Sequence, residues 1–159
     1  MENVMHVADY IASRYQRDYG FQIDEMKLHK LMYFTQKESF IQNDEPLFEA
    51  VFYGWKYGPV LKEIRAVFME KGDFPCTNPD LGAFGSGFQA IMDRVFSDYA
   101  LKPSWSLSRL THGEISWKRS REGIPDGESG NNPMDIEEIR RDATILKERR
   151  KALAALGVS

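Results

Sequence analysis

The sequence predicts a mainly α domain of the α+β class: a compact, single-domain bundle of about five to six helices with a short β element around residues 48–55. Two observations lead to this prediction. Apolar residues recur at helical spacing over most of the chain, whereas alternation with a period of two appears clearly in that one stretch. The 159 residues, 42% of them hydrophobic and 13% aromatic, fit one domain with its own core. This composition excludes intrinsic disorder for most of the chain.

Apolar stripes predict the first two helices. The first covers about residues 3–17 and ends before Gly20. Asp24 offers an N-cap for a longer helix that runs to about residue 42. Its helically spaced positions are Leu28, Leu31, Met32, Thr35 and Ser39, and three lysines lie between them, Lys27, Lys30 and Lys37.

Residues 48–55 change the period and are rich in aromatic side chains that favour strands. We therefore expect a short strand there. Pro59 stands where a helix often takes proline at its first position, so we expect a third helix from this residue to a C-terminal cap at Gly72.

The second half alternates loops and helices. Glycine, proline and Asn78 predict a loop over residues 73–87, and strong periodicity predicts a helix over 88–99. A short helix is expected over residues 103–112, followed by a polar, glycine-rich loop over 121–133.

Asp135 and Glu138 form a capping-box-like start to a final helix. The apolar positions of this helix are sparse, and beyond Arg149 most of its surface is charged or small. We expect this helix to pack on the domain or to project from it.

Composition excludes several classes of function. The net charge is −3 and no basic face is evident, so DNA is not the expected partner. The single cysteine and three scattered histidines provide no metal motif, and no sequence typical of a cofactor site is present. No long apolar run suggests a membrane span or a leader, so we expect a cytoplasmic protein without cofactor or metal.

Thr111 and His112, with Glu114 close by, are the strongest candidates for a nucleophile and base. Neighbours in sequence point in different directions on a helix, so their adjacency does not place them in hydrogen-bonding reach. His112 precedes Gly113, where a histidine can meet the last carbonyls of a helix. We therefore predict no catalytic residue, and an enzyme that uses Thr111 and His112 remains the less favoured alternative.

Aromatic residues stand out in the GWKYGP segment, residues 54–59, and at Trp105 and Trp117. Large aromatic side chains with polar tips suit a seam in the core. They suit a binding surface equally well, because tyrosine, tryptophan and arginine supply much of the binding energy of interfaces. Spacing alone leaves both readings open.

Three linked motifs resemble the Panacea domain family, which includes SocA-type antitoxins and phage-associated proteins. The family pattern is a K-L-x-K-L-x-Y-F helix, a G-x-P-L-F turn, and a strand ending in W-x-Y-G-P-V. The first motif is matched by Lys27, Leu28, Lys30, Leu31, Tyr33 and Phe34, the second by Glu45, Pro46, Leu47 and Phe48, and the third by Trp55, Tyr57, Gly58, Pro59 and Val60.

A fourth segment is similar to the family's L-x-x-L-T-H-x-x-x-P-W block, although Ser116 stands where proline is usual. Its matching residues are Leu107, Leu110, Thr111, His112 and Trp117. The resemblance implies a Panacea-like domain over residues 1–121. Composition and capping predict a flexible loop over 122–133 and a charged C-terminal helix over 134–159. That final helix departs from the usual ending of the family.

The resemblance implies a bacterial antitoxin that neutralises a cognate protein toxin by direct binding and is not an enzyme. An alternative within the family is a proteolytic adaptor that delivers the toxin to an AAA+ protease. On this basis we expect a partner-binding surface and no catalytic or metal site. The expected partner-binding residues are Lys27, Lys30, Tyr33, Trp55, Lys56, Tyr57, Pro59, Thr111, His112 and Trp117.

Overall fold

A computed structural model describes residues 1–77 and 84–158 of the chain. This part forms seven α-helices and one two-stranded antiparallel sheet, which confirms the predicted mainly α fold with a short β element. The predicted loop at 73–87 lies partly outside the described residues. The elements are α1 Val4–Tyr19, α2 Glu25–Asn43, β1 Phe52–Trp55, β2 Gly58–Leu61, α3 Lys62–Lys71, α4 Phe88–Val95, a π-helical turn η1 Phe96–Ala100, α5 Ser104–His112, α6 Ile115–Ser120 and α7 Ile136–Ala155.

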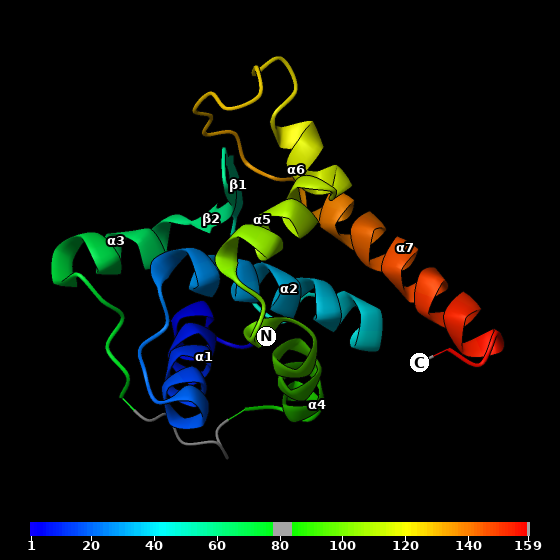
Figure 1. Cartoon of the computed structure of the whole chain (residues 1–159), viewed down its shortest axis with the longest axis horizontal. Helices are drawn as coiled ribbons and strands as arrows, with labels where there is room; N and C mark the ends of the chain where they lie inside the picture. The colour runs from blue at the N-terminus through cyan, green and yellow to red at the C-terminus, as the bar shows by residue number, and fades with distance from the viewer. Residues whose placement is uncertain (78–83, 159) are drawn as a thin grey trace.

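Helix α2 lies at the centre of the molecule, in contact with α1, α3, α4, α5, α7 and β2 (Figure 1). Every residue from Lys27 to Phe40 is buried. The sequence predicted an apolar stripe with lysines between its positions, which is the pattern of a helix with one solvent-facing side. The structure differs because neighbours cover α2 on all sides, including the positions that carry polar side chains.

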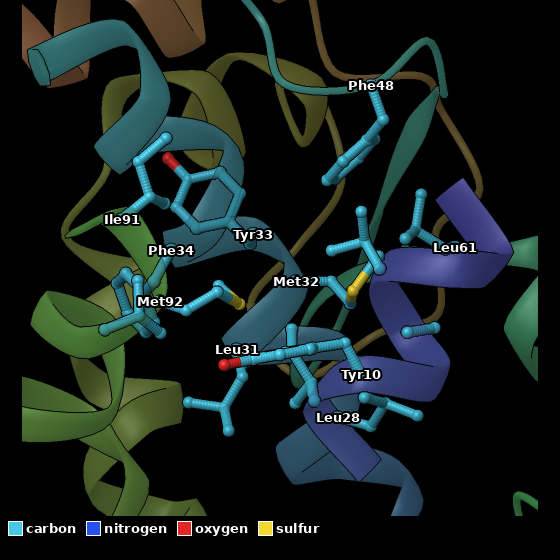
Figure 2. Close-up of a cluster of buried hydrophobic side chains, with 14 of the residues drawn as sticks. Tyr10, Leu28, Leu31, Met32, Tyr33, Phe34, Phe48, Leu61, Ile91 and Met92 are labelled. Carbon is cyan, nitrogen blue, oxygen red and sulfur yellow. The ribbon is translucent and has the colours of Figure 1, made fainter. Parts of the chain in front are cut away.

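The hydrophobic core surrounds α2. Side chains from α1, α2, α4 and the β element enter one cluster (Figure 2). Tyr10 packs edge-to-face against Phe88, with ring centroids 5.0 Å apart, and Phe34 stacks on Tyr99 at 4.0 Å. These aromatic pairs join α1 to α4 and α2 to η1, so the large aromatic content is used mainly to hold the helices together.

The β element is a hairpin rather than one strand. Strand β1 pairs with β2 through Gly54 opposite Pro59 and Trp55 opposite Gly58. The prediction that Pro59 begins the third helix is therefore wrong, and α3 starts at Lys62. Proline lacks a backbone N–H, so it suits the first turn of a helix and an edge strand alike, and local sequence does not distinguish the two.

Helix α6 was not predicted. Its six residues are too few to show helical periodicity, and the cap of its first turn comes from a distant helix. Asp142 of α7 accepts hydrogen bonds from the backbone N–H groups of Ile115 (2.8 Å) and Ser116 (2.9 Å). The same carboxylate accepts a hydrogen bond from the Tyr33 hydroxyl of α2 (3.3 Å). One buried side chain thus ties α2, α6 and α7 together.

Helix α7 packs against α2 and α6 over its first turns, where Ile139 and Ala143 are buried. Further along, Arg150 forms two hydrogen bonds with the buried carboxylate of Glu38, at 2.9 and 3.0 Å. Residues 151–158 are all exposed. The helix is therefore anchored up to Arg150, and its last turns extend away from the core.

Replacing Asp142 by alanine should destabilise the protein strongly. The change leaves three donors, two of them buried, without their charged acceptor, so we expect the free energy of unfolding to fall by about 3 kcal/mol. Urea unfolding measures this loss. Glu148→Ala, at an exposed position on the same helix, is the matched control and should change stability by less than about 0.5 kcal/mol. Equal effects of the two substitutions would contradict the proposed role of Asp142.

Candidate functional site

A pocket of about 650 Å³ opens between the start of α2, the hairpin, the first turns of α3 and the segment 129–131. This volume lies within the range of pockets that bind small molecules or parts of a peptide. Two aromatic side chains, Trp55 and Tyr57, form an aromatic rim, and four basic side chains line the wall. The lining residues are Glu25, Met26, His29, Lys30, Trp55, Lys56, Tyr57, Gly58, Pro59, Val60, Lys62, Arg65, Ser129, Gly130 and Asn131.

Two neighbouring helices fasten the hairpin turn that forms one side of the pocket. The Trp117 Nε1–H of α6 donates to the carbonyl of Trp55 (2.8 Å), and the Ser108 hydroxyl of α5 donates to the carbonyl of Tyr57 (3.0 Å). Gly58 adopts a φ of 131°, which is accessible essentially to glycine alone. A Cβ atom there would also lie 3.0 Å from Thr111 Oγ1. The turn is therefore held in one conformation.

The segment that ends the 121–133 loop forms another part of the wall. Trp55 Nε1–H donates to Asn131 Oδ1 (3.1 Å). The backbone N–H of Gly54 donates to the carbonyl of Asn132 (2.9 Å), so this segment runs beside β1. Arg121 reaches the carbonyl of Gly54 from the other end of the loop (3.0 Å). Residues distant in sequence are thus joined at the pocket.

Lys30 is the most unusual side chain in the wall. Only 2% of its surface is exposed, yet no hydrogen bond or ion pair to its amine is present among the described residues. Burial lowers the pKa of Lys30 to about 8, and the nearby charge of Asp24 opposes this shift only partly. Lys27, one turn earlier, is also buried but donates to Tyr15 Oη (3.3 Å) and to the carbonyl of Ala100 (3.0 Å).

Glu25, His29 and Arg65 form a connected group beside Lys30. His29 Nδ1 accepts a hydrogen bond from the backbone N–H of Leu61 (3.2 Å), so Nε2 carries the proton and donates to Glu25 (3.0 Å). The second oxygen of Glu25 pairs with Arg65 (2.6 Å). Burial lowers the pKa of His29, which favours the neutral imidazole. Both oxygens of the Glu25 carboxylate are therefore engaged.

Positive charge predominates around the pocket. Among the described residues its wall carries four basic side chains and a single acidic one, Glu25. Lys62 lies over the ring of Tyr53, 3.8 Å from the centroid, and Lys56 lies over that of Tyr57 at 5.0 Å. In a chain of net charge −3, this concentration of cations favours an anionic ligand or an acidic surface.

Half of the predicted partner-binding residues meet at this pocket: Lys30, Trp55, Lys56, Tyr57 and Pro59. The other five do not line it. Lys27, Tyr33 and Thr111 are buried and do not line the pocket, so in this conformation they support the surface from within. Trp117 holds the hairpin through Trp55, and His112 stacks on Trp117 with ring centroids 4.1 Å apart.

Thr111 and His112 are not arranged as a nucleophile and base. The Thr111 hydroxyl donates to the carbonyl of Ser108 (2.9 Å), one turn back in the same helix. His112 Nε2 is buried and has no hydrogen-bond partner among the described residues, and burial lowers the pKa of this imidazole. The sequence predicted that His112 meets the last carbonyls of its helix. In the structure its ring stacks on Trp117 instead.

Several pocket residues were not predicted, notably Glu25, His29, Lys62, Arg65 and the segment 129–131. One signal was available, because Glu25 and His29 are four residues apart and so share a helix face. The remaining residues come from separate elements. Only the packing of α3 and of the 129–131 segment beside the hairpin brings them to the pocket.

Helix α7 carries six basic side chains over residues 140–151, and neighbouring acids neutralise most of them. Four of its six basic side chains have an acidic partner within 4.0 Å. The pairs are Arg140 with Asp44, Arg141 with Glu138, Arg150 with Glu38 and Lys151 with Glu148. Such pairing reduces the positive potential that phosphate binding requires.

Within residues 1–77 and 84–158, no group of three or more histidine, cysteine, aspartate or glutamate side chains is placed to hold a metal ion. None of the helices in this part of the chain has both the length and the apolar character needed to cross a bilayer.

A mainly α fold with a preformed pocket, aromatic at its rim and basic on its wall, is typical of a binding domain. Residues 28–118, more than half of the chain, match the family described as antitoxin SocA-like, Panacea domain. The protein belongs to this family, which confirms the resemblance inferred from the sequence motifs. No curated protein and no solved structure matches the chain.

The buried amine of Lys30 should make stability depend on pH. Its pKa is about 8 in the folded protein, against an ordinary value of 10.5, so between these values the unfolded chain binds more protons. The free energy of unfolding should therefore rise as the pH increases above about 8. Relative to Lys30→Met, we expect a rise on the order of 1 kcal/mol between about pH 8 and 9.5. Parallel pH profiles of the two proteins in urea unfolding would contradict this prediction.

Proposed function

We propose that this protein is an antitoxin that neutralises a cognate protein toxin by direct binding, so that inhibition is steric and no covalent bond is made or broken. Membership of the SocA-like antitoxin family carries this proposal. The pocket and its aromatic rim are the proposed contact surface. The Thr111 hydroxyl bonds to the carbonyl of Ser108 and the His112 ring stacks on Trp117, so their arrangement gives no support to the enzyme alternative.

The pocket rim has the character of an interface centre. Tyr57 is 58% exposed at the tip of the hairpin, and Met26 is also exposed at the start of α2. Tyrosine and tryptophan side chains commonly supply the largest contributions to binding. Because neighbouring helices already hold the hairpin turn, little conformational freedom would be lost when a partner binds.

An antitoxin complex should bury a wider area than the pocket alone. Stable protein complexes bury about 1,200 to 2,000 Å² in total. Exposed apolar side chains near the start of α2 and on the preceding segment, including Met26 and Phe21, could extend the contact. We therefore expect the pocket to form the centre of the interface rather than the whole of it.

Tyr57→Ala should weaken neutralisation without unfolding the protein. The ring is largely exposed, so its loss should leave stability nearly unchanged while removing contact area at the centre of the interface. We expect the affinity for the toxin to fall at least about tenfold, a loss of about 1.4 kcal/mol. The measurement is growth rescue on co-expression with the product of the neighbouring gene, followed by calorimetry on the purified pair.

Trp105→Ala is the matched control, because Trp105 is a similarly exposed aromatic residue on α5 that does not line the pocket. It should leave rescue intact. Loss of rescue in both variants, or in neither, would argue against the pocket as the contact surface. A neighbouring gene product that is harmless, or that the wild-type protein does not neutralise, would refute the antitoxin proposal itself.

A second candidate is a proteolytic adaptor that delivers the toxin to an AAA+ protease. The exposed residues 151–158 favour it, because they extend beyond the last anchor of α7, the Arg150–Glu38 ion pair, and are accessible to another protein. In this role the body would hold the toxin and the exposed turns would contact the protease.

Removing residues 151–159 tests the adaptor alternative. The truncation keeps Asp142 and Arg150, so the fold and toxin binding should be retained. For an adaptor, degradation of the toxin should cease while binding persists, as measured by toxin half-life and co-purification. Full neutralisation with an unchanged toxin half-life would favour steric inhibition instead.

A further inference from the structure

Lys30 differs from the other buried polar side chains of α2 in its hydrogen bonding. The other buried polar side chains between Lys27 and Phe40 each have a partner within the protein. These are Lys27, His29, Tyr33, Thr35, Gln36, Lys37, Glu38 and Ser39. Lys30 has no such partner among the described residues, and it forms part of the pocket wall. A mostly buried charge that no protein group pairs is unfavourable, and because Lys30 lines the pocket, its amine is available to a ligand.

We propose that the pocket receives a carboxylate of the partner polypeptide, from an aspartate or glutamate side chain or from a chain end, which pairs with the Lys30 ammonium. This inference rests on the proposed function, because it names the chemistry by which the pocket would hold the toxin. In this arrangement Lys30 supplies the central ion pair and the aromatic rim supplies contact area.

The charges of the pocket wall fit this ligand. Glu25, the acidic residue of the wall, already uses both oxygens, one with His29 and one with Arg65. It therefore leaves Lys30 free to pair with an incoming acid. Lys56, Lys62 and Arg65 add positive charge around the opening, which would attract an acidic segment and favour its retention.

The geometry favours a single carboxylate over a phosphate group. A phosphate site commonly uses free backbone N–H groups at a helix N-terminus, but Asp24 already accepts the N–H of Lys27 at the start of α2 (2.8 Å). The carboxylates of Asp24 and Glu25 at this end would also repel a dianion. Met26, Pro59 and Val60 add apolar wall that suits the methylene groups of an acidic side chain and its neighbours in a peptide.

Binding of a carboxylate can be measured without the toxin. The probe is the blocked amino acid acetyl-glutamate amide, titrated while the ε-methylene signals of the lysines are followed by NMR. Comparison with Lys30→Met assigns the Lys30 signal. We expect a saturable shift of this signal with a dissociation constant on the order of 1 to 10 mM, as suits so small a ligand, and a rise in the pKa of Lys30.

Acetyl-glutamine amide and inorganic phosphate are the control ligands. The uncharged amide should shift the Lys30 signal at least about tenfold more weakly than the acid. An equal response to the amide, or no saturation with the acid, would overturn the proposal. Tighter binding of phosphate would also overturn it and would assign the pocket to a phosphorylated ligand.

A comparison of Lys30→Met with Lys27→Met tests the role of Lys30 in the complex with the toxin. Methionine at position 30 removes an unpaired charge, so the urea midpoint should be unchanged or higher while toxin affinity falls at least about tenfold. Methionine at position 27 removes a hydrogen-bonded amine, so the midpoint should fall while the folded fraction binds normally.

The outcomes separate this proposal from the proposed function. Wild-type-like rescue by Lys30→Met would refute a partner carboxylate at Lys30 and leave the antitoxin role standing. If the probe also saturates the wild-type pocket in that case, the ligand is a free carboxylate. If the wild-type protein neutralises no toxin, the antitoxin role fails, and with it the assignment of the carboxylate to that partner.

Discussion

The burial of α2 on all sides is the constraint on which the rest of the structure depends. A helix in this position must find a partner for each polar side chain it carries, because water cannot reach them. Gln36 meets this demand by binding the backbone of Leu47 and Phe48, and Glu38 by pairing with Arg150. Each such partner fixes the place of another element, so the polar groups of α2 help to specify the packing around it.

The same requirement explains how α7 and the pocket are connected to the core. Asp142 accepts hydrogen bonds from Tyr33 on α2 and from the first turn of α6. Helix α6 in turn holds the hairpin through a hydrogen bond from Trp117. The pocket wall is therefore built on hydrogen bonds that lead back to α2. In the part of the chain that the structure describes, the Lys30 amine has no hydrogen-bond partner, and it lies where the hairpin, α2 and α3 meet.

Local sequence predicted much of the helical fold and part of the site. The helices at α1, α2, α4 and α7 follow from periodicity and caps, and GWKYGP was recognised as an aromatic segment of structural or functional importance. The second strand was missed because Pro59 also suits a helix start. Helix α6 was missed because its cap, Asp142, lies far away in the sequence.

By itself the sequence determined the mainly α class, the family, and the residue types available for binding, because periodicity, caps and contiguous motifs are local properties. Only the tertiary structure decided which buried lysine is hydrogen-bonded within the protein and which one lines the pocket. Lys27 and Lys30 occupy equivalent places in the same motif, yet one meets a carbonyl of η1 and the other meets the pocket. That difference arises from the elements packed around α2, and the spacing of residues along one helix does not encode it.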